Sequence, residues 1–345
     1  MAASFGWDLG GANLKLARVE GGRVLEVVQI PCPVLGDRSK FDLAVEEALK
    51  ICPPGARHAV TMTGELSDVF QNRAEGVAYL VGLMRKATGA ETGFYGLRSD
   101  LLDADQAVER WQEVASANWH ASAALAAKHC GDGLLVDVGT TTTDLIPLKD
   151  GKETALGLND GQRLFEGELI YVGVVRTPVM AIAQAAPFKG RMQSIAAERF
   201  ATMADVYRLT GDLPDDADPY PAADQRGKSI EESAARLARM LGRDAGEADL
   251  IAWKALAHFF ARRQLDQIEG VSRALFEREA LPREAPVIGA GCGRFLAQSL
   301  AKRLDRPYRD FAGLIDCAPE AREMAAACAP AVAVALLFFS SERAT

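Results

Sequence analysis

The chain has 345 residues, of which 49% are hydrophobic and 25% are charged, and its formal net charge is −8. These values are typical of a soluble globular protein, and the length is sufficient for two lobes that each have a hydrophobic core. Because no basic arm or stripe offsets the negative charge, the composition argues against a nucleic-acid partner.

Strands and helices alternate in the N-terminal part of the chain. Gly-rich turns separate apolar stretches that predict successive strands at 4–8, 14–20 and 24–30. Further strands are predicted at 59–63 and 92–97, and helices at 41–52, 73–88, 104–111 and 117–130. Because helices that alternate with strands cover both faces of a sheet, this order predicts an α/β fold with mixed sheets flanked by helices.

The same alternation begins again after residue 131. The predicted elements are a strand at 133–137, its hairpin partner at 142–148, a helical region at about 190–280, a strand at 286–288, a helix to about 303, a strand at 307–309 and a closing helix. The acidic stretch 212–224 is predicted to form an exposed loop, which either has no role or acts as a lid. We therefore divide the chain into a first lobe, 1–131, and a second lobe, 132–345, which contains the helical insertion.

The cysteines and the apolar segments indicate the compartment. The six cysteines are scattered and form no CxxC pair, so we expect reduced thiols that are mostly buried. The N-terminus has no basic segment followed by an apolar one. The apolar run 324–340 contains Pro330 and is shorter than a membrane span of about 20 residues. The sequence therefore predicts a cytoplasmic protein with no membrane partner.

Two loops of similar pattern each follow the first strand of a predicted lobe. They read Asp8-Leu9-Gly10-Gly11-Ala12-Asn13 and Asp137-Val138-Gly139-Thr140-Thr141-Thr142. Glycines and hydroxyl groups let backbone N–H groups approach a phosphate, and a carboxylate can hold Mg²⁺ directly or through water. We predict that Asp8 and Asp137 position Mg²⁺. The predicted phosphate-binding residues are Gly10, Gly11, Asn13, Gly139, Thr140, Thr141 and Thr142.

Each loop has a simpler alternative. An Asp-x-Gly sequence also forms ordinary turns that bind nothing. Lys15, on the strand that leaves the first loop, either reaches a phosphate or faces solvent, and we include it among the phosphate-binding residues. Asp144 either assists at the metal or is solvated.

Three further features are candidates for the site. Gly289, Gly291 and Gly293 lie between a predicted strand and a helix, where an anion or a nucleotide can approach the backbone closely. No acidic residue follows at the spacing of a dinucleotide fingerprint, which argues against a Rossmann dehydrogenase.

Glu65 is predicted as a catalytic acid or base, the alternative being a polar helix cap in this segment. His120 either contacts substrate or is a buried structural residue.

Together these loops resemble the phosphate and nucleotide motifs of the actin, Hsp70 and sugar-kinase superfold. The chain is more closely similar to the hydantoinase A and oxoprolinase family, through Met62-Thr63-Gly64-Glu65-Leu66 and through the segment 137–144. Within that family, its short length and the segments 117–121 and 167–178 resemble a branch linked to tetrahydromethanopterin-dependent one-carbon transfer.

The resemblance implies a two-lobed, RNase H-like fold and a transferase of methanofuran biosynthesis. Such an enzyme joins an aminomethylfuran-methyl diphosphate to a tyramine- or tyrosine-derived phenol, forms an ether and releases diphosphate. The expected cofactor is Mg²⁺, and the expected partners are the diphosphate and the phenolic acceptor. The oligomeric state, including a homo-oligomer, is left open.

Two other classes of function are compatible with the same loops. One is an ATP-dependent small-molecule kinase or a hydantoinase- or oxoprolinase-type hydrolase, and the other is a nucleotide-switched binding module. The third loop reads Gly-Ala-Gly-Cys-Gly, where nucleotide-binding relatives often have a plain Gly-Gly pair. This departure favours a substrate diphosphate over ATP.

Overall fold

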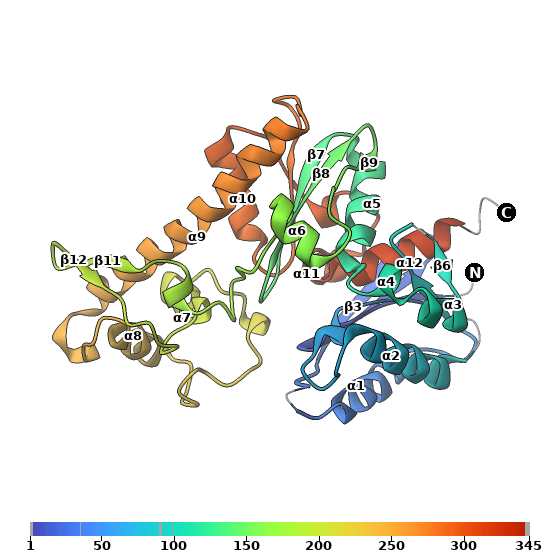
Figure 1. Cartoon of the computed structure of the whole chain (residues 1–345), viewed down its shortest axis with the longest axis horizontal. Coiled ribbons are helices and arrows are strands. Elements are labelled where there is room, and N and C mark those ends of the chain that lie inside the picture. Colours follow the sequence, from blue (N-terminus) through green and yellow to red (C-terminus); the bar gives the residue numbers. More distant parts are fainter. Residues whose placement is uncertain (1–2, 35, 90–91, 99, 342–345) are drawn as a thin grey trace. The chain divides into compact units, whose positions relative to one another are not determined.

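The computed structural model describes residues 3–34, 36–89, 92–98 and 100–341. Two compact units make up the chain (Figure 1). Unit 1 comprises Met1–Leu135, Ile146–Glu166 and Arg309–Thr345, and unit 2 comprises Val136–Leu145 and Gly167–Tyr308. Part of the predicted second lobe therefore packs with the first.

The sheet of unit 1 is mixed, as the sequence predicts. Its order is β3-β2-β1-β4-β5-β6. The bounds are β1 Ser4–Leu9, β2 Asn13–Glu20, β3 Arg23–Pro31, β4 Arg57–Met62, β5 Thr92–Tyr95 and β6 Leu101–Leu102. Strands β1, β2 and β3 form an antiparallel meander, and β4 and β5 run parallel to β1. Parallel neighbours require crossover connections, which the helices provide.

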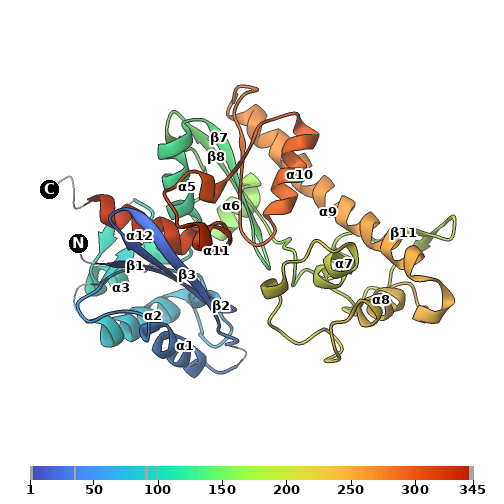
Figure 2. The same cartoon turned by 180° about the vertical axis from the view of Figure 1, so that it is seen from behind.

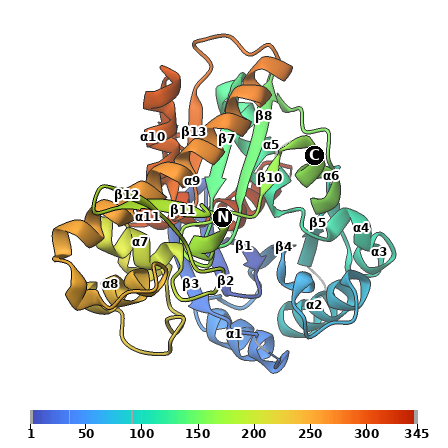
Figure 3. The ribbon, with the colours of Figure 1, turned by 60° about the vertical axis from the view of Figure 1, so that its left-hand side comes forward.

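The helices of unit 1 come from the N-terminal part, the middle and the C-terminal part of the chain. They are α1 Ser39–Leu49, α2 Arg73–Thr88, α3 Ala104–Glu109, α4 Trp111–Val114, α5 Asn118–Cys130, α6 Asp160–Glu166, α11 Arg322–Ala327 and α12 Ala329–Ser341. Figure 3 shows α1 and α2 together on one side of the strands of this sheet. Helix α12 packs on β1, β2 and β4 of this sheet, and Figure 2 shows it beside β1.

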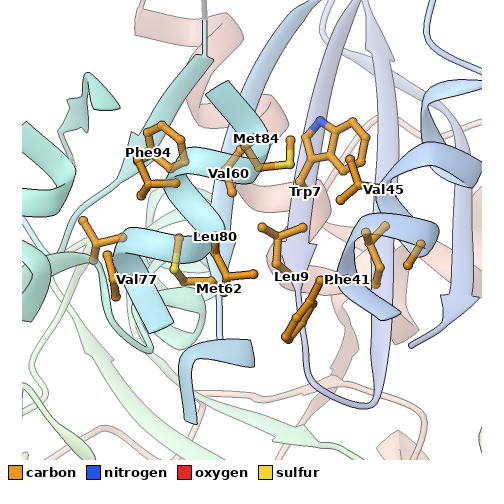
Figure 4. Close-up of a cluster of buried hydrophobic side chains, with 14 of the residues drawn as sticks. Trp7, Leu9, Phe41, Val45, Val60, Met62, Val77, Leu80, Met84 and Phe94 are labelled. Carbon is orange, nitrogen blue, oxygen red and sulfur yellow. The ribbon is translucent and has the colours of Figure 1, made fainter. Parts of the chain in front are cut away.

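The core of unit 1 follows from side-chain alternation along β1 and β4. Trp7 and Leu9 point to the same face of the sheet and pack with the α1 residue Phe41 and the α2 residue Leu80 (Figure 4). All four side chains are buried. Because successive residues of a strand point to opposite faces, Gly6 and Asp8 belong to the other face.

Gly6 allows α12 to pack directly on β1. A Cβ atom on Gly6 would overlap the carbonyl oxygen of Ala331 and lie 2.7 Å from the backbone nitrogen of Ala335. Backbone atoms inside a helix cannot move aside cheaply. We therefore expect Gly6→Ala to lower the free energy of unfolding by about 2–3 kcal/mol, measured by urea denaturation.

Gly82 provides the matched control for this substitution. It lies within α2, and a Cβ atom there would meet nothing within 4 Å. Because alanine is the better helix former, Gly82→Ala should raise the stability by up to about 1 kcal/mol. Equal effects of the two substitutions would contradict the close packing of α12 on Gly6.

A second sheet has the order β10-β8-β7-β13-β14, and β9 pairs with β8. The bounds are β7 Gly133–Val138, β8 Thr143–Lys149, β9 Lys152–Glu153, β10 Leu169–Ile170, β13 Val287–Ala290 and β14 Tyr308–Asp310. The strands predicted at 133–137, 142–148, 286–288 and 307–309 are thereby confirmed. Helix α10, Arg294–Leu304, follows β13 as predicted.

Most of the predicted insertion is helical, but its beginning is not. Its helices are α7 Met203–Thr210, α8 Ile230–Arg239 and the long α9 Leu250–Arg278 (Figure 1). A hairpin of β11 Ala185–Phe188 and β12 Arg191–Ser194 precedes them, so the helical prediction is wrong at its start. The hairpin packs on α9, where Phe188 stacks on Trp253 with ring centroids 4.8 Å apart.

Two further expectations concern thiols and membrane spans. All six cysteines are free thiols, and Cys32 and Cys328 are buried while the others are half-buried. In the described part of the chain, no single helix is long and apolar enough to cross a bilayer. A bent pair, Pro319–Ala327 with Ala329–Phe338, reaches that length and apolarity only when its two helices, which meet at 108°, are taken together.

Candidate active site

Asp8 lies in a row of polar residues across the sheet of unit 1. Its register partners are Thr61 on β4 and Lys15 on β2, so the three side chains share the face opposite Trp7 and Leu9. Lys15 Nζ lies 2.7 Å from Asp8 Oδ2. Asp8 is fully buried, whereas the Lys15 side chain is 24% exposed. Lys15 therefore neutralises Asp8, and its contact with a phosphate stays a prediction.

Several buried oxygen atoms in this row have no protein partner. Within the described residues, Asp8 Oδ1, Asn13 Oδ1 and Thr61 Oγ1 accept and donate no hydrogen bond. Asn13 lies two residues before Lys15 on β2, so it belongs to the same face. Buried polar atoms nearly always have partners, and a group of unpartnered oxygens therefore indicates a bound cation, water or ligand donor.

The glycines of the first loop allow the chain to turn tightly. A Cβ atom on Gly10 would lie 2.7 Å from the carbonyl oxygen of Asn13, and one on Gly11 would overlap the Ser67 hydroxyl. The Gly10 N–H is also bonded to the Asp8 carbonyl oxygen at 3.2 Å. The backbone contact explains why glycine is required at position 10, whereas at position 11 the close atom is the movable Ser67 hydroxyl. Phosphate binding by Gly10 and Gly11 stays a prediction.

Glu65 lies in the short 3-10 helix η1, Gly64–Leu66, which directly follows β4. Its carboxyl group is almost fully buried, and burial raises its pKa to about 7, although a hydrogen bond from Ser116 acts in the opposite direction. Ser116 Oγ donates to Glu65 Oε1 at 2.7 Å. Glu65 Oε2 has no hydrogen-bond partner among the described residues. A carboxyl group with these properties can exchange a proton near neutral pH.

The alternative of a helix cap in this segment does not hold for Ser67 or Asp68. The cap of α2 is Asn72, whose side chain accepts a hydrogen bond from the Glu75 N–H at 2.9 Å. Glu65 lies outside this cap.

His120 is part of a buried polar chain. Its Nδ1 lies 2.9 Å from the Tyr95 hydroxyl, and its Nε2 lies 3.0 Å from Glu153 Oε1. The hydrogen bond from His120 lowers the pKa of Glu153. Both ring nitrogens are thus engaged by protein groups, which supports the structural alternative. Substrate contact by His120 stays a prediction.

The second loop lies in unit 2 and is held by a segment that sequence analysis did not connect with it. The Val174 N–H is bonded to the Gly139 carbonyl oxygen at 3.1 Å, and the Arg176 N–H to the Thr140 carbonyl oxygen at 2.9 Å. A Cβ atom on Gly173 would lie 2.5 Å from the Thr140 carbonyl carbon. The segment 173–176 therefore fixes the backbone that carries the threonine hydroxyls.

The third loop packs on the second within unit 2. Gly291 has φ +81°, and a Cβ atom there would overlap Asp137 Oδ1 and the Val138 carbonyl oxygen. The Gly293 N–H is bonded to the same carbonyl oxygen at 2.8 Å. A Cβ atom on Gly289 would lie 2.6 Å from the Tyr308 hydroxyl. Internal packing thus accounts for these glycines, and their contact with a ligand stays a prediction.

Mg²⁺ at this row of residues stays a prediction, which can be compared with the oxygen atoms present. Among the described residues, no group of three or more His, Cys, Asp or Glu side chains is arranged to hold a metal ion. Mg²⁺ usually keeps several waters and is bound by one or two carboxylates together with substrate phosphates. The unpartnered Oδ1 of Asp8 fits that mode of binding.

Comparison with known proteins identifies relatives. The family model described as hydantoinase/oxoprolinase matches residues 57–337. A (4-{4-[2-(gamma-L-glutamylamino)ethyl]phenoxymethyl}furan-2-yl)methanamine synthase from Methanocaldococcus jannaschii is 32% identical over 241 residues, which are 69% of this chain and 71% of the relative. A protein of the same name from Methanococcus vannielii is 42% identical over 79 residues, 23% of this chain and 34% of that relative.

A solved structure agrees on the fold. Acetone carboxylase in its nucleotide-free form aligns with 97% of this chain and 70% of its own, at a TM-score of 0.59 and 9% identity. The structure confirms the predicted α/β fold of mixed sheets flanked by helices, and this fold is similar to that of the acetone carboxylase. The relatives are named synthases, which indicates an enzyme. From the family model and the identity over most of its length, the chain belongs to the hydantoinase/oxoprolinase family.

Proposed function

We propose that this enzyme is a transferase of methanofuran biosynthesis. It joins an aminomethylfuran-methyl diphosphate to the phenol of a tyramine- or tyrosine-derived acceptor, forms an aryl ether and releases diphosphate. The relatives support the choice of substrates, because the product in their name is a phenoxymethyl ether of a furan that carries an amine. The observation that carries the proposal is Glu65, a buried carboxyl with an unpartnered oxygen and a pKa of about 7.

The reaction breaks one carbon–oxygen bond and forms another. The bond between the furan methylene carbon and the bridging oxygen breaks, and its electron pair leaves with diphosphate. The phenol oxygen forms the new bond to the methylene carbon, and its proton passes to Glu65. An unperturbed phenol has a pKa of about 10, so a base placed beside it assists the attack.

The leaving group must be neutralised because negative charge develops on it. In the proposal, the Gly11 N–H group and the hydroxyls of the threonine loop bind the diphosphate oxygens. The N–H groups of Gly10 and Gly139 are bonded to the Asp8 and Thr142 carbonyl oxygens and hold the two turns in shape. Asp8 and Asp137 are the residues that would hold Mg²⁺, which would supply positive charge to the departing diphosphate. In the proposal, Lys15 contacts a diphosphate oxygen while it remains paired with Asp8.

Water must be excluded while the methylene carbon is electron-deficient, since water would give an alcohol in place of the ether. The burial of Asp8, Thr61 and Glu65 supports such a site. The packing of Gly289, Gly291 and Gly293 on neighbouring protein atoms gives these glycines a structural reason that requires no nucleotide.

The test uses the full chain with Mg²⁺, the furanmethyl diphosphate and a phenolic acceptor, without ATP. The expected result is an ether, detected by mass spectrometry, with one diphosphate released for each ether formed. Chelation of Mg²⁺ should stop both. Absence of ether without ATP, together with nucleotide turnover when ATP and acceptor are supplied, would contradict the transferase and favour the ATP-dependent alternative.

A further inference from the structure

Ser116 has a backbone conformation that serine rarely adopts. Its φ is +54°, in the left-handed region that favours glycine. It lies in the short link between α4 and α5, where it is buried. Its hydroxyl donates to Glu65 Oε1 at 2.7 Å, although 51 positions separate the two residues in the chain. Strained residues of this kind persist only where their surroundings hold them.

The surroundings of Ser116 hold it in place. The preceding residue, Ala115, forms a parallel bridge with Met62 at the end of β4. The Ala115 N–H is also bonded to the Trp111 carbonyl oxygen at 2.8 Å, and the Ala117 N–H to the Val114 carbonyl oxygen at 3.3 Å. The strand that leads to Glu65 and the link that carries Ser116 are thus joined through their backbones.

Helix α2 also packs against Glu65. A Cβ atom on Gly76 would lie 2.7 Å from Glu65 Cα, so the helix backbone rests directly on this residue. One carboxyl oxygen is bonded to Ser116, and the other is buried without a partner in the described residues. The carboxyl group therefore has a fixed orientation and one oxygen left for a ligand.

Two charged groups near Glu65 shift its pKa in opposite directions. Arg73 on α2 lowers the pKa of Glu65, whereas Asp160 on α6 raises it. Arg73 and Asp160 form an ion pair at 3.1 Å, so their effects partly cancel. After burial, the hydrogen bond from Ser116 has the largest effect on the pKa of Glu65, and it favours the ionised carboxylate.

We propose that Ser116 is a positioning residue whose strained backbone holds its hydroxyl against Glu65 Oε1, so that Glu65 Oε2 accepts the proton of a weakly acidic ligand hydroxyl such as a phenol. This inference rests on the proposed function, in which Glu65 is the base. In the step, the phenol O–H bond breaks, the proton passes to Oε2, and the oxygen electron pair forms the ether bond.

The test compares Ser116→Ala with Ser122→Ala. Ser122 is a matched control because it is also buried, on α5, and its hydroxyl has no hydrogen-bond partner in the described part of the chain. The titration of Glu65 is followed by NMR of ¹³C-labelled glutamate carboxyls in the full chain without substrate. The signal is assigned by its loss in Glu65→Gln. The acidic limb of ether formation is measured in parallel.

Removal of the Ser116 hydroxyl takes away a hydrogen bond to the ionised carboxylate, so the pKa of Glu65 must rise. We expect an upward shift of about one pH unit in Ser116→Ala, with the same displacement of the acidic limb, and no shift in Ser122→Ala. Ser116→Gly relieves the backbone strain and lacks the hydroxyl, so it should remain folded and show the same shift.

An unchanged titration of Glu65 in a folded Ser116→Ala or Ser116→Gly variant would overturn the proposal. An equal shift in Ser122→Ala would also overturn it, since the effect would then not be specific to the Ser116 hydroxyl. The NMR titration needs no turnover. If the shift occurs but the wild-type enzyme forms no ether, the positioning role stands and the proposed function fails.

Discussion

Replacement of Asp8 by Asn is expected to lower kcat/KM for ether formation at least about 100-fold while the protein remains folded. Asp8 is fully buried; one of its oxygens pairs with Lys15, and the other has no partner among the described residues. Asparagine has nearly the same shape but no charge, so it removes the cation-binding group without creating a cavity. The rate is measured as ether formed, and the fold by circular dichroism and thermal unfolding.

The control separates loss of the metal site from loss of the ion pair. Lys15→Met also breaks the contact with Asp8, but it leaves the carboxylate in place. We expect Asp8→Asn to raise the Mg²⁺ concentration that gives the half-maximal rate, whereas Lys15→Met should lower the rate without that change. Asp137→Asn should resemble Asp8→Asn. Retained activity in both aspartate variants would show that these carboxylates do not hold the metal.

Replacement of Arg236 by Met is expected to lower the free energy of unfolding of unit 2 by about 3–5 kcal/mol. Arg236 is fully buried on α8, and its Nε donates to Asp205 Oδ1 at 2.8 Å. Its Nη1 donates to Asp224 Oδ1 and to the Gly227 carbonyl oxygen, each at 3.0 Å. Methionine fills the volume of the stem but leaves the buried Asp205 with less compensation.

Arg273 is the surface control for this substitution. It forms an ion pair with Glu269 on α9 at 2.7 Å, but its side chain is 54% exposed. Exposed ion pairs contribute little to the free energy of unfolding. Arg273→Met should therefore change it by less than about 1 kcal/mol. Urea denaturation measures both variants. Similar losses in the two would contradict the importance of the buried network.

The same network anchors the acidic loop 212–224. Arg208 and Lys228 both pair with Asp218, and Arg236 pairs with Asp224, so the predicted exposed loop is anchored at two of its aspartates. In Arg236→Met, the rate of amide hydrogen exchange should rise more in this loop than in α9. A uniform rise over unit 2 would show that the anchor is not local.

The sequence predicts the sheets and the positions of the two Asp-Gly loops because these features have local signals. Alternating apolar residues and Gly-rich turns locate β1 to β4, and the Asp-Gly patterns locate both loops. The hairpin β11–β12 was missed because its turn, Lys189-Gly190, is preceded by alanines and a proline, which favour strands weakly.

The supporting contacts of the site have no such signals. The hydrogen bond between Ser116 and Glu65 joins residues far apart in the chain, and nothing in a serine indicates a positive φ. The unpartnered hydroxyl of Thr61 depends on the register of β4 with β1, which a single sequence does not reveal. The packing of Gly173 on the threonine loop likewise depends on how the chain returns to β8.

The central claim is that the substrate's carbon–oxygen bond breaks and that no phosphoryl group is transferred. The most direct measurement uses a furanmethyl diphosphate whose bridging oxygen, between the methylene carbon and phosphorus, is ¹⁸O. After reaction with the phenolic acceptor, Mg²⁺ and the wild-type enzyme, mass spectrometry locates the label. We predict that all of it is found in the released diphosphate and none in the ether. Label retained on the furan methylene carbon would mean that the phosphorus–oxygen bond breaks, and it would contradict the account.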